Sequence, residues 1–276
     1  MKKFFKKLWK FAIDNYFISI FLACIVFVGL VSFYKLFFVQ PTFVYAKVKV
    51  GQGLWWATTQ HPSFWFVESL KKGMEETDLT GEPIAEIQDL LYYSYYGGSQ
   101  YDIYLNLKLK ATGSQKTKKY NFKRSAIGVG APIDLEFPTV QVSGTIIELS
   151  EKPINDGLVE KTVYLTKKYA YPWEYDAIQI GDKFYNGREV VFEVLDKSQS
   201  DSYETAINTG SGEFPNTTDP SQTELRKYII VKAKIKIRPF GDKLIFGEEH
   251  IISPGRTSPV STDAYAFNNF LIEKVE

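Results

Sequence analysis

The chain has 276 residues, with 33 basic and 32 acidic side chains and a formal net charge of +1. The first 40 residues hold six of the basic side chains and one of the acidic ones, so residues 41–276 carry a net charge of −4. Because phosphate binding needs a basic face, this balance argues against nucleic acid as a partner. The single cysteine, Cys24, lies in the apolar N-terminal segment, so the rest of the chain has no disulfide, thiol nucleophile or cysteine metal ligand.

The N-terminal segment is basic and then apolar. Five lysines and one aspartate lie in residues 1–15, and the 19 residues from Tyr16 to Tyr34 carry no charge. Roughly 20 apolar residues in a helix cross a bilayer, so we predict one transmembrane helix over residues 16–39. The positive-inside rule predicts a cytoplasmic tail at 1–15 and an extracytoplasmic body in the cell envelope. A cleaved signal peptide competes with this interpretation, but no small-residue cleavage site follows Val31.

The remainder of the chain has the pattern of β-strands. Apolar and polar residues alternate in 42–51, 101–110 and 227–236. A period of two places alternate side chains on opposite faces of a sheet, one dry and one wet. We therefore predict a mainly β body.

Five segments recur in the same order along this body, which indicates a diverged duplication. The matched pairs are 42–51 with 160–169, 61–73 with 171–181, 81–87 with 187–194, 101–110 with 227–236, and 127–148 with 251–273. They predict two units, 42–150 and 158–276, joined by a polar linker at 150–157. Each should be a small barrel or sandwich of five or six strands and one short helix. A Ser-, Thr- and Asp-rich segment, 196–225, is predicted to be a flexible exposed loop.

One turn in the second unit carries a resemblance to a known family. The residues are Ile178-Gln179-Ile180-Gly181-Asp182, followed by Gly187 and Val190. With the basic tail and apolar helix, they resemble an uncharacterised family of bacterial single-pass envelope proteins with a duplicated β domain. The resemblance implies fold and topology and no activity. The first unit departs from this pattern, because Gly73-Met74 stands where the second has Gly181-Asp182.

The sequence offers little for catalysis. Of the two histidines, His61 precedes a predicted helix and is interpreted as a flank or cap. His250 adjoins Glu248 and Glu249, but neighbouring side chains on a strand point to opposite faces and cannot converge on one ion. Paired acids such as Glu75 and Glu76 allow a glycosidase in principle. We predict no catalytic residues, no metal site and no cofactor.

Aromatic residues provide the candidate binding site. Trp65 and Trp173 occupy corresponding places in the two units, which favours a role in the core. Six other residues lack counterparts in the second unit and are the predicted binding residues: Trp55, Trp56, Tyr92, Tyr93, Tyr95 and Tyr96. Clustered tyrosine and tryptophan are typical of protein interfaces and of platforms for sugar rings.

Three functional hypotheses follow. The first is a non-enzymatic, membrane-anchored adaptor that presents two β modules to envelope or secretion-machinery proteins, and it also allows a homo-oligomer. The second is a module that binds cell-wall or capsular glycan through the aromatic cluster. The third is an envelope hydrolase.

Overall fold

The computed structural model describes residues 15–38, 42–51, 61–95, 99–114, 117–202 and 226–276. Contacts divide the chain into Met1–Thr42 and a compact body over Phe43–Glu276. The described helices are α2 (Tyr16–Phe38), α3 (Phe64–Ser69) and α4 (Pro172–Ala177). The rest of the described body consists mainly of strands and the turns between them, as predicted.

The N-terminal helix corrects one prediction. Within the part of the chain that the structure describes, no helix is long and apolar enough to cross a membrane. On this criterion the prediction of a transmembrane helix over 16–39 is wrong.

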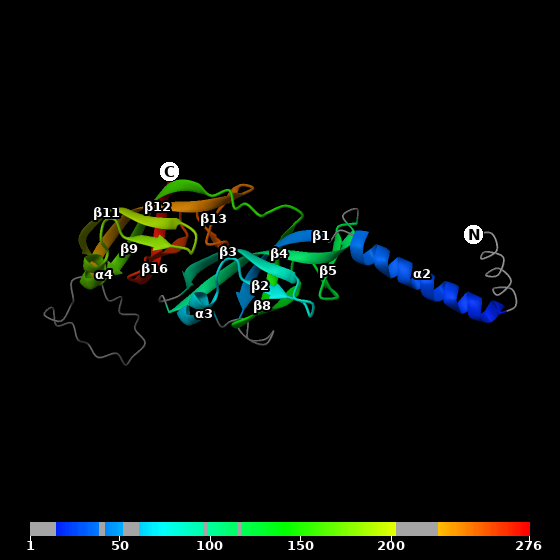
Figure 1. Cartoon of the computed structure of the whole chain (residues 1–276). Coiled ribbons are helices and arrows are strands. Elements are labelled where there is room, and N and C mark those ends of the chain that lie inside the picture. Colours follow the sequence, from blue (N-terminus) through cyan, green and yellow to red (C-terminus); the bar gives the residue numbers. More distant parts are fainter. Residues whose placement is uncertain (1–14, 39–41, 52–60, 96–98, 115–116, 203–225) are drawn as a thin grey trace, which may run out of the picture. The chain divides into compact units, whose positions relative to one another are not determined.

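The body contains two barrel-like sheets of eight strands each, more than the five or six expected (Figure 1). We call the part with the first sheet the N-terminal β unit and the part with the second the C-terminal β unit. The first sheet is formed by β1 (Thr42–Gly51), β2 (Glu75–Thr77), β3 (Pro83–Tyr95), β4 (Gln100–Ser114), β5 (Lys119–Phe122), β6 (Ser125–Ile127), β7 (Pro132–Phe137) and β8 (Val140–Ser150). The second is formed by β9 (Val159–Ala170), β10 (Lys183–Tyr185), β11 (Val190–Ser202), β12 (Arg226–Phe240), β13 (Lys243–Phe246), β14 (His250–Ile251), β15 (Thr257–Ser261) and β16 (Ala266–Val275).

The two sheets have the same topology, which confirms the internal repeat. The first runs β2-β3-β4-β1-β8-β7, with the hairpin β5-β6 attached to β4. The second runs β10-β11-β12-β9-β16-β15, with β13-β14 attached to β12. Strand for strand, the two orders match. The alternating residues of the strands form the barrel cores, as Ile103, Leu105, Leu107 and Leu109 in β4 show, each at 0% exposure.

Backbone hydrogen bonds repeat at the same places in both units. The N–H of Gly73 donates to Ile87 O at 2.8 Å, and the N–H of Gly181 donates to Val194 O at 2.8 Å. Both glycines have positive φ, 82° and 92°, which a residue without a Cβ adopts without strain. The first unit therefore forms the same turn even though Met74 replaces Asp182.

The first seven residues of the predicted flexible loop form a strand in the structure. Residues 196–202 belong to β11 and pair with β12 from Lys232 to Arg226. The polar side chains of this part of β11 face solvent, so the segment has the composition of an exposed loop. The rest of the predicted loop, 203–225, lies outside the described residues.

Candidate functional site

A row of four side chains crosses the outer face of the N-terminal β unit. Asp89 on β3 pairs in register with Asn106 on β4, and Lys47 on β1 pairs with Glu148 on β8. β4 and β1 are neighbours in the sheet, so the four positions run across it. Register shifts beside Asp89 and beside Lys47 mark β-bulges, which re-aim side chains locally. We call this row the docked face, because the C-terminal β unit lies on it.

Ion pairs fix the C-terminal β unit to the docked face. Lys47 is 0% exposed and pairs with Asp156 of the linker and, at 2.9 Å, with Glu248 of the β13–β14 turn. Two further ion pairs join the units at the ends of the row. Arg188 pairs with Asp89 at 3.0 Å, and Arg238 pairs with Glu148 at 2.8 Å. Arg188 and Arg238 also bond the acids that hold Lys47, to Asp156 at 2.6 Å and to Glu248 at 3.1 Å. The charges are therefore compensated as a connected network.

The network shifts the pKa of Asp156. Burial acts to raise the pKa of this carboxyl, but hydrogen bonds and charge from Lys47 and Arg188 together outweigh burial and lower it. The polar linker predicted at 150–157 thus contains a buried residue, since Asp156 is 3% exposed. Glu248, interpreted from the sequence as part of a solvated strand edge, has a side chain that is 6% exposed. His250 is exposed, as that interpretation expected.

Apolar packing and a tight turn complete this interface. Leu91, Tyr93 and Tyr104 of the N-terminal unit belong to the same hydrophobic cluster as the core of the C-terminal unit. The amide of Asn186 donates to the Tyr93 hydroxyl at 3.2 Å, and the N–H of Tyr92 donates to Asn186 O at 2.9 Å. The two β units are consequently packed as one body.

The predicted binding tyrosines that the structure describes lie in different environments. Tyr93 is 7% exposed and burial raises its pKa, so it belongs to the interface between the units. Tyr95 is 37% exposed and stacks on His61, whose Nδ1 lies 3.0 Å from Asp102 Oδ1. The remaining predicted residues Trp55, Trp56 and Tyr96 lie outside the described residues.

Tyr92 lines an aromatic groove of about 410 Å³ between the two β units. Phe64, Tyr101, Tyr185 and Tyr265 also line it, as do the carboxylates of Glu68 and Asp263. The rings of Tyr92 and Tyr101 meet edge to face at 5.7 Å. Burial raises the pKa of both hydroxyls, and the charge of Asp263 raises it further. Only Tyr92 of these residues was a predicted site residue, because the groove forms from segments far apart in sequence.

The prediction of core roles for Trp65 and Trp173 is wrong. Their side chains are 65% and 57% exposed, while Phe66 and Val67 supply the buried side of α3. Trp173 packs against Tyr171 and Phe267 at the surface, with ring centroids 5.9 and 5.6 Å apart. Matching positions in a repeat indicate equal geometry and do not by themselves indicate burial.

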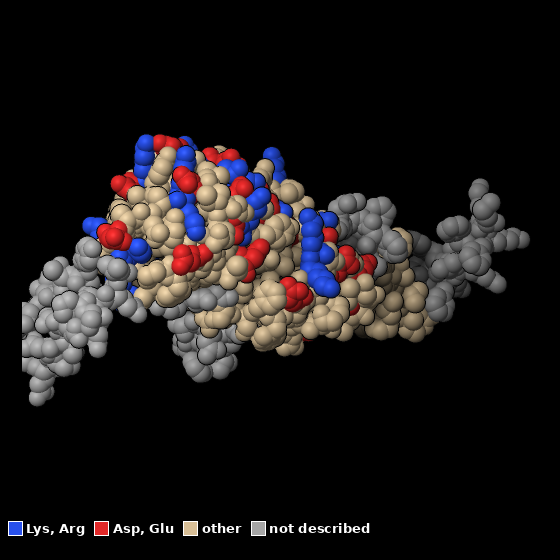
Figure 2. Space-filling model, turned by 90° about the vertical axis from the view of Figure 1, so that its left-hand side faces the viewer, with Lys and Arg blue, Asp and Glu red and all other residues tan. Residues whose placement is uncertain are grey.

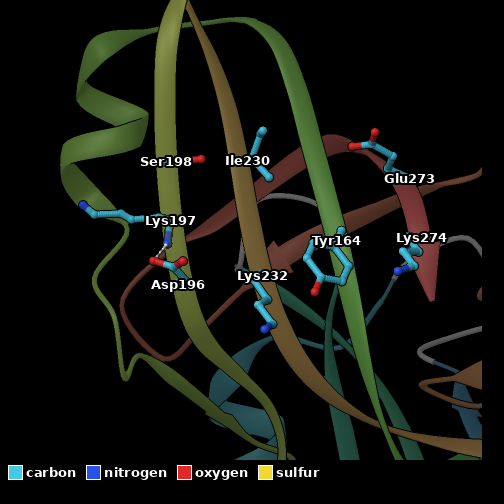
Figure 3. A pocket seen from close by; sticks show the side chains of 8 residues that line it. All are labelled: Tyr164, Asp196, Lys197, Ser198, Ile230, Lys232, Glu273 and Lys274. Carbon is cyan, nitrogen blue, oxygen red and sulfur yellow. Dashed lines mark hydrogen bonds between the residues drawn. The ribbon is translucent and has the colours of Figure 1, made fainter. Parts of the chain in front are cut away.

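The outer face of the C-terminal β unit contains a second hollow, of about 600 Å³ (Figure 3). Lys232 on β12, Tyr164 on β9 and Lys274 on β16 lie side by side in it. The two ammonium groups lie 5.6 and 5.7 Å from the centre of the Tyr164 ring, close enough for cation–π attraction. Asp196 on β11 completes the row, and its carboxylate accepts the Lys197 N–H at 2.9 Å.

A further face of the body carries charges of both signs (Figure 2). On the face shown in Figure 2, basic and acidic side chains alternate over the upper part, and much of the lower part is uncharged. Comparison of the chain with protein-family models, with curated proteins and with solved structures found no match.

Proposed function

We propose that the protein is a non-enzymatic adaptor whose two β units form a rigid platform for partner proteins. The observation that carries this proposal is the packing of one β unit on the outer face of its duplicate through Lys47 and its partners. This fold therefore already recognises protein through its outer face. The second copy of that face remains exposed on the C-terminal unit. Placement of the body in the cell envelope stays a prediction.

Site-specific photo-crosslinking in the native host tests the adaptor function. A photoreactive residue is placed at Ser198, beside the hollow of the C-terminal unit, and in separate variants at Tyr101 in the groove and at Lys119 on β5. An adaptor should give discrete adducts with one or a few proteins, from some positions and not from others. The same diffuse background from every position would refute the proposal.

The aromatic groove favours glycan binding as a second candidate function. Phe64, Tyr92 and Tyr101 offer ring faces and edges within one groove, and the acids Glu68 and Asp263 offer acceptors for sugar hydroxyls. A screen on cell-wall and capsular glycans would test it, with Tyr101→Ala as the groove variant and Trp173→Ala as the control. Loss of binding in the groove variant alone would support this function. Absence of binding to every glycan would exclude it.

A further inference from the structure

The hollow on the C-terminal unit occupies the same structural position as the docked face. The equivalence rests on register: Asp196 pairs with Lys232, and Tyr164 pairs with both Lys232 and Lys274. Register shifts beside Asp196 and beside Lys274 match those of the docked face. The equivalent pairs are therefore Asp89 with Asp196, Asn106 with Lys232, Lys47 with Tyr164, and Glu148 with Lys274. We call the row Asp196, Lys232, Tyr164 and Lys274 the open face.

The docked face shows what such a row accommodates. Its central residue, Lys47, receives two carboxylates, one from Asp156 and one from Glu248 at a hairpin turn. Its acidic end, Asp89, receives the guanidinium of Arg188. The docked face is thus covered by acids of the linker and of the β13–β14 turn over its centre, and by one arginine over each of its acidic ends.

The open face keeps the acid at one end of the row, but its positive charge lies on either side of the centre and not at the position of Lys47. Lys232 and Lys274 flank Tyr164 at its centre, and Asp196 lies at the β11 end, where Asp89 lies in the docked face. Lys274 pairs with Glu276, whereas Lys232 makes no ion pair with any residue that the structure describes. An occupant with acids over Lys232 and a base over Asp196 would be complementary.

Resting on the proposed adaptor function, we propose that the open face binds an acidic β-turn of a partner protein through Lys232 and Lys274, whereas the docked face holds the Glu248 turn through Lys47. A second copy of this chain fits less well. The N-terminal unit of a second copy would present the turn of the β5–β6 hairpin. Arg124 occupies the position of Glu248 in that turn, and the two residues share a positive φ, 69° for Arg124 and 67° for Glu248. An arginine there would approach Lys232 and Lys274, and like charges repel.

The test uses a cyclised peptide of residues 243–251, the hairpin that carries Glu248 and Glu249. It is titrated into the full chain, isotopically labelled, and amide shifts are followed by NMR. Shifts should cluster around Tyr164, Lys232 and Lys274. Binding should weaken about tenfold or more for Lys232→Glu/Lys274→Glu, and equally for a peptide in which both glutamates are lysine. The peptide with two lysines should bind the Lys232→Glu/Lys274→Glu protein more tightly than it binds the wild type.

The matched control is Lys119→Glu/Lys152→Glu, which makes the same charge change at two exposed lysines of the N-terminal unit and the linker. It should bind the peptide as wild type does. Lack of binding, shifts confined to the docked face, or equal binding of both peptides would overturn the inference. Concentration-dependent dimerisation that Lys232→Glu/Lys274→Glu abolishes would assign the face to a second copy instead. Crosslinked partners found only at other positions would leave the adaptor function standing while this inference falls.

Discussion

Replacement of Lys47 by methionine tests whether the buried network holds the two β units together. Methionine keeps the apolar length of the side chain, so the change removes mainly the ammonium. Breaking a buried ion pair from one side costs about 3–5 kcal/mol. Asp156 keeps Arg188 at 2.6 Å and Glu248 keeps Arg238 at 3.1 Å, so we expect the lower end of that range, about 3 kcal/mol.

Urea unfolding followed by circular dichroism measures the loss. The matched control is Lys49→Met, two residues along β1, whose side chain is 28% exposed and pairs with Asp102 and Glu249. Because the Lys49 ammonium is partly exposed and Asp102 keeps His61 Nδ1 at 3.0 Å, these two pairs should contribute about 1 kcal/mol together. Lys47→Met should also split a single transition into two as the units uncouple. A free energy of unfolding for Lys47→Met equal to that of Lys49→Met would refute the reasoning.

Three further predictions concern the same body. The pKa of Asp156 is lowered in the folded protein, so this carboxylate stabilises the fold above the range where an ordinary aspartate titrates, around pH 4. This stabilisation is lost as the pH falls through the folded pKa. The urea midpoints at pH 7 and pH 3 should therefore differ less in Asp156→Asn than in wild type. Gly187→Ala should destabilise by at least about 2 kcal/mol, because φ is +94° and a Cβ would lie 2.7 Å from Leu90 O; an unchanged thermal midpoint would contradict this. Trp65→Ala and Trp173→Ala should each change stability by no more than about 0.5 kcal/mol, since both side chains are exposed; a core-like loss in calorimetry would show that α3 and α4 pack differently.

Much of the fold was predictable from local pattern. Alternation in 101–110 and 227–236 predicted β4 and β12, and the matched blocks predicted two equivalent units. The short strands escaped prediction because two to four residues show no period. β5, β6, β13 and β14 are of this kind.

The interface between the units was not predictable, because it depends on which outward-facing residues meet. Lys47 follows the wet-face alternation of β1 and reads as a solvated lysine, yet it is 0% exposed. Asp156 lies in a segment whose Pro and Gly content indicated a linker. Tyr93 looked like part of a surface cluster and is packed beneath Phe246, with ring centroids 5.6 Å apart. Nothing in the spacing of these residues specifies partners about a hundred or more positions away.

The way the two faces have diverged bears on how the open one is used. At three equivalent positions, the residues beside the docked face are Leu91, Tyr104 and Ile147, and those beside the open face are Ser198, Ile230 and Glu273. Permanent interfaces resemble a domain core, whereas reversible ones are more polar and hold partners through complementary charge. The three residues beside the docked face have the composition of the first kind, whereas Ser198 and Glu273 beside the open face are polar, as in the second. A partner on the open face should therefore bind reversibly, and its affinity should fall as the salt concentration rises. Binding that salt leaves unchanged would count against a charge-based interface.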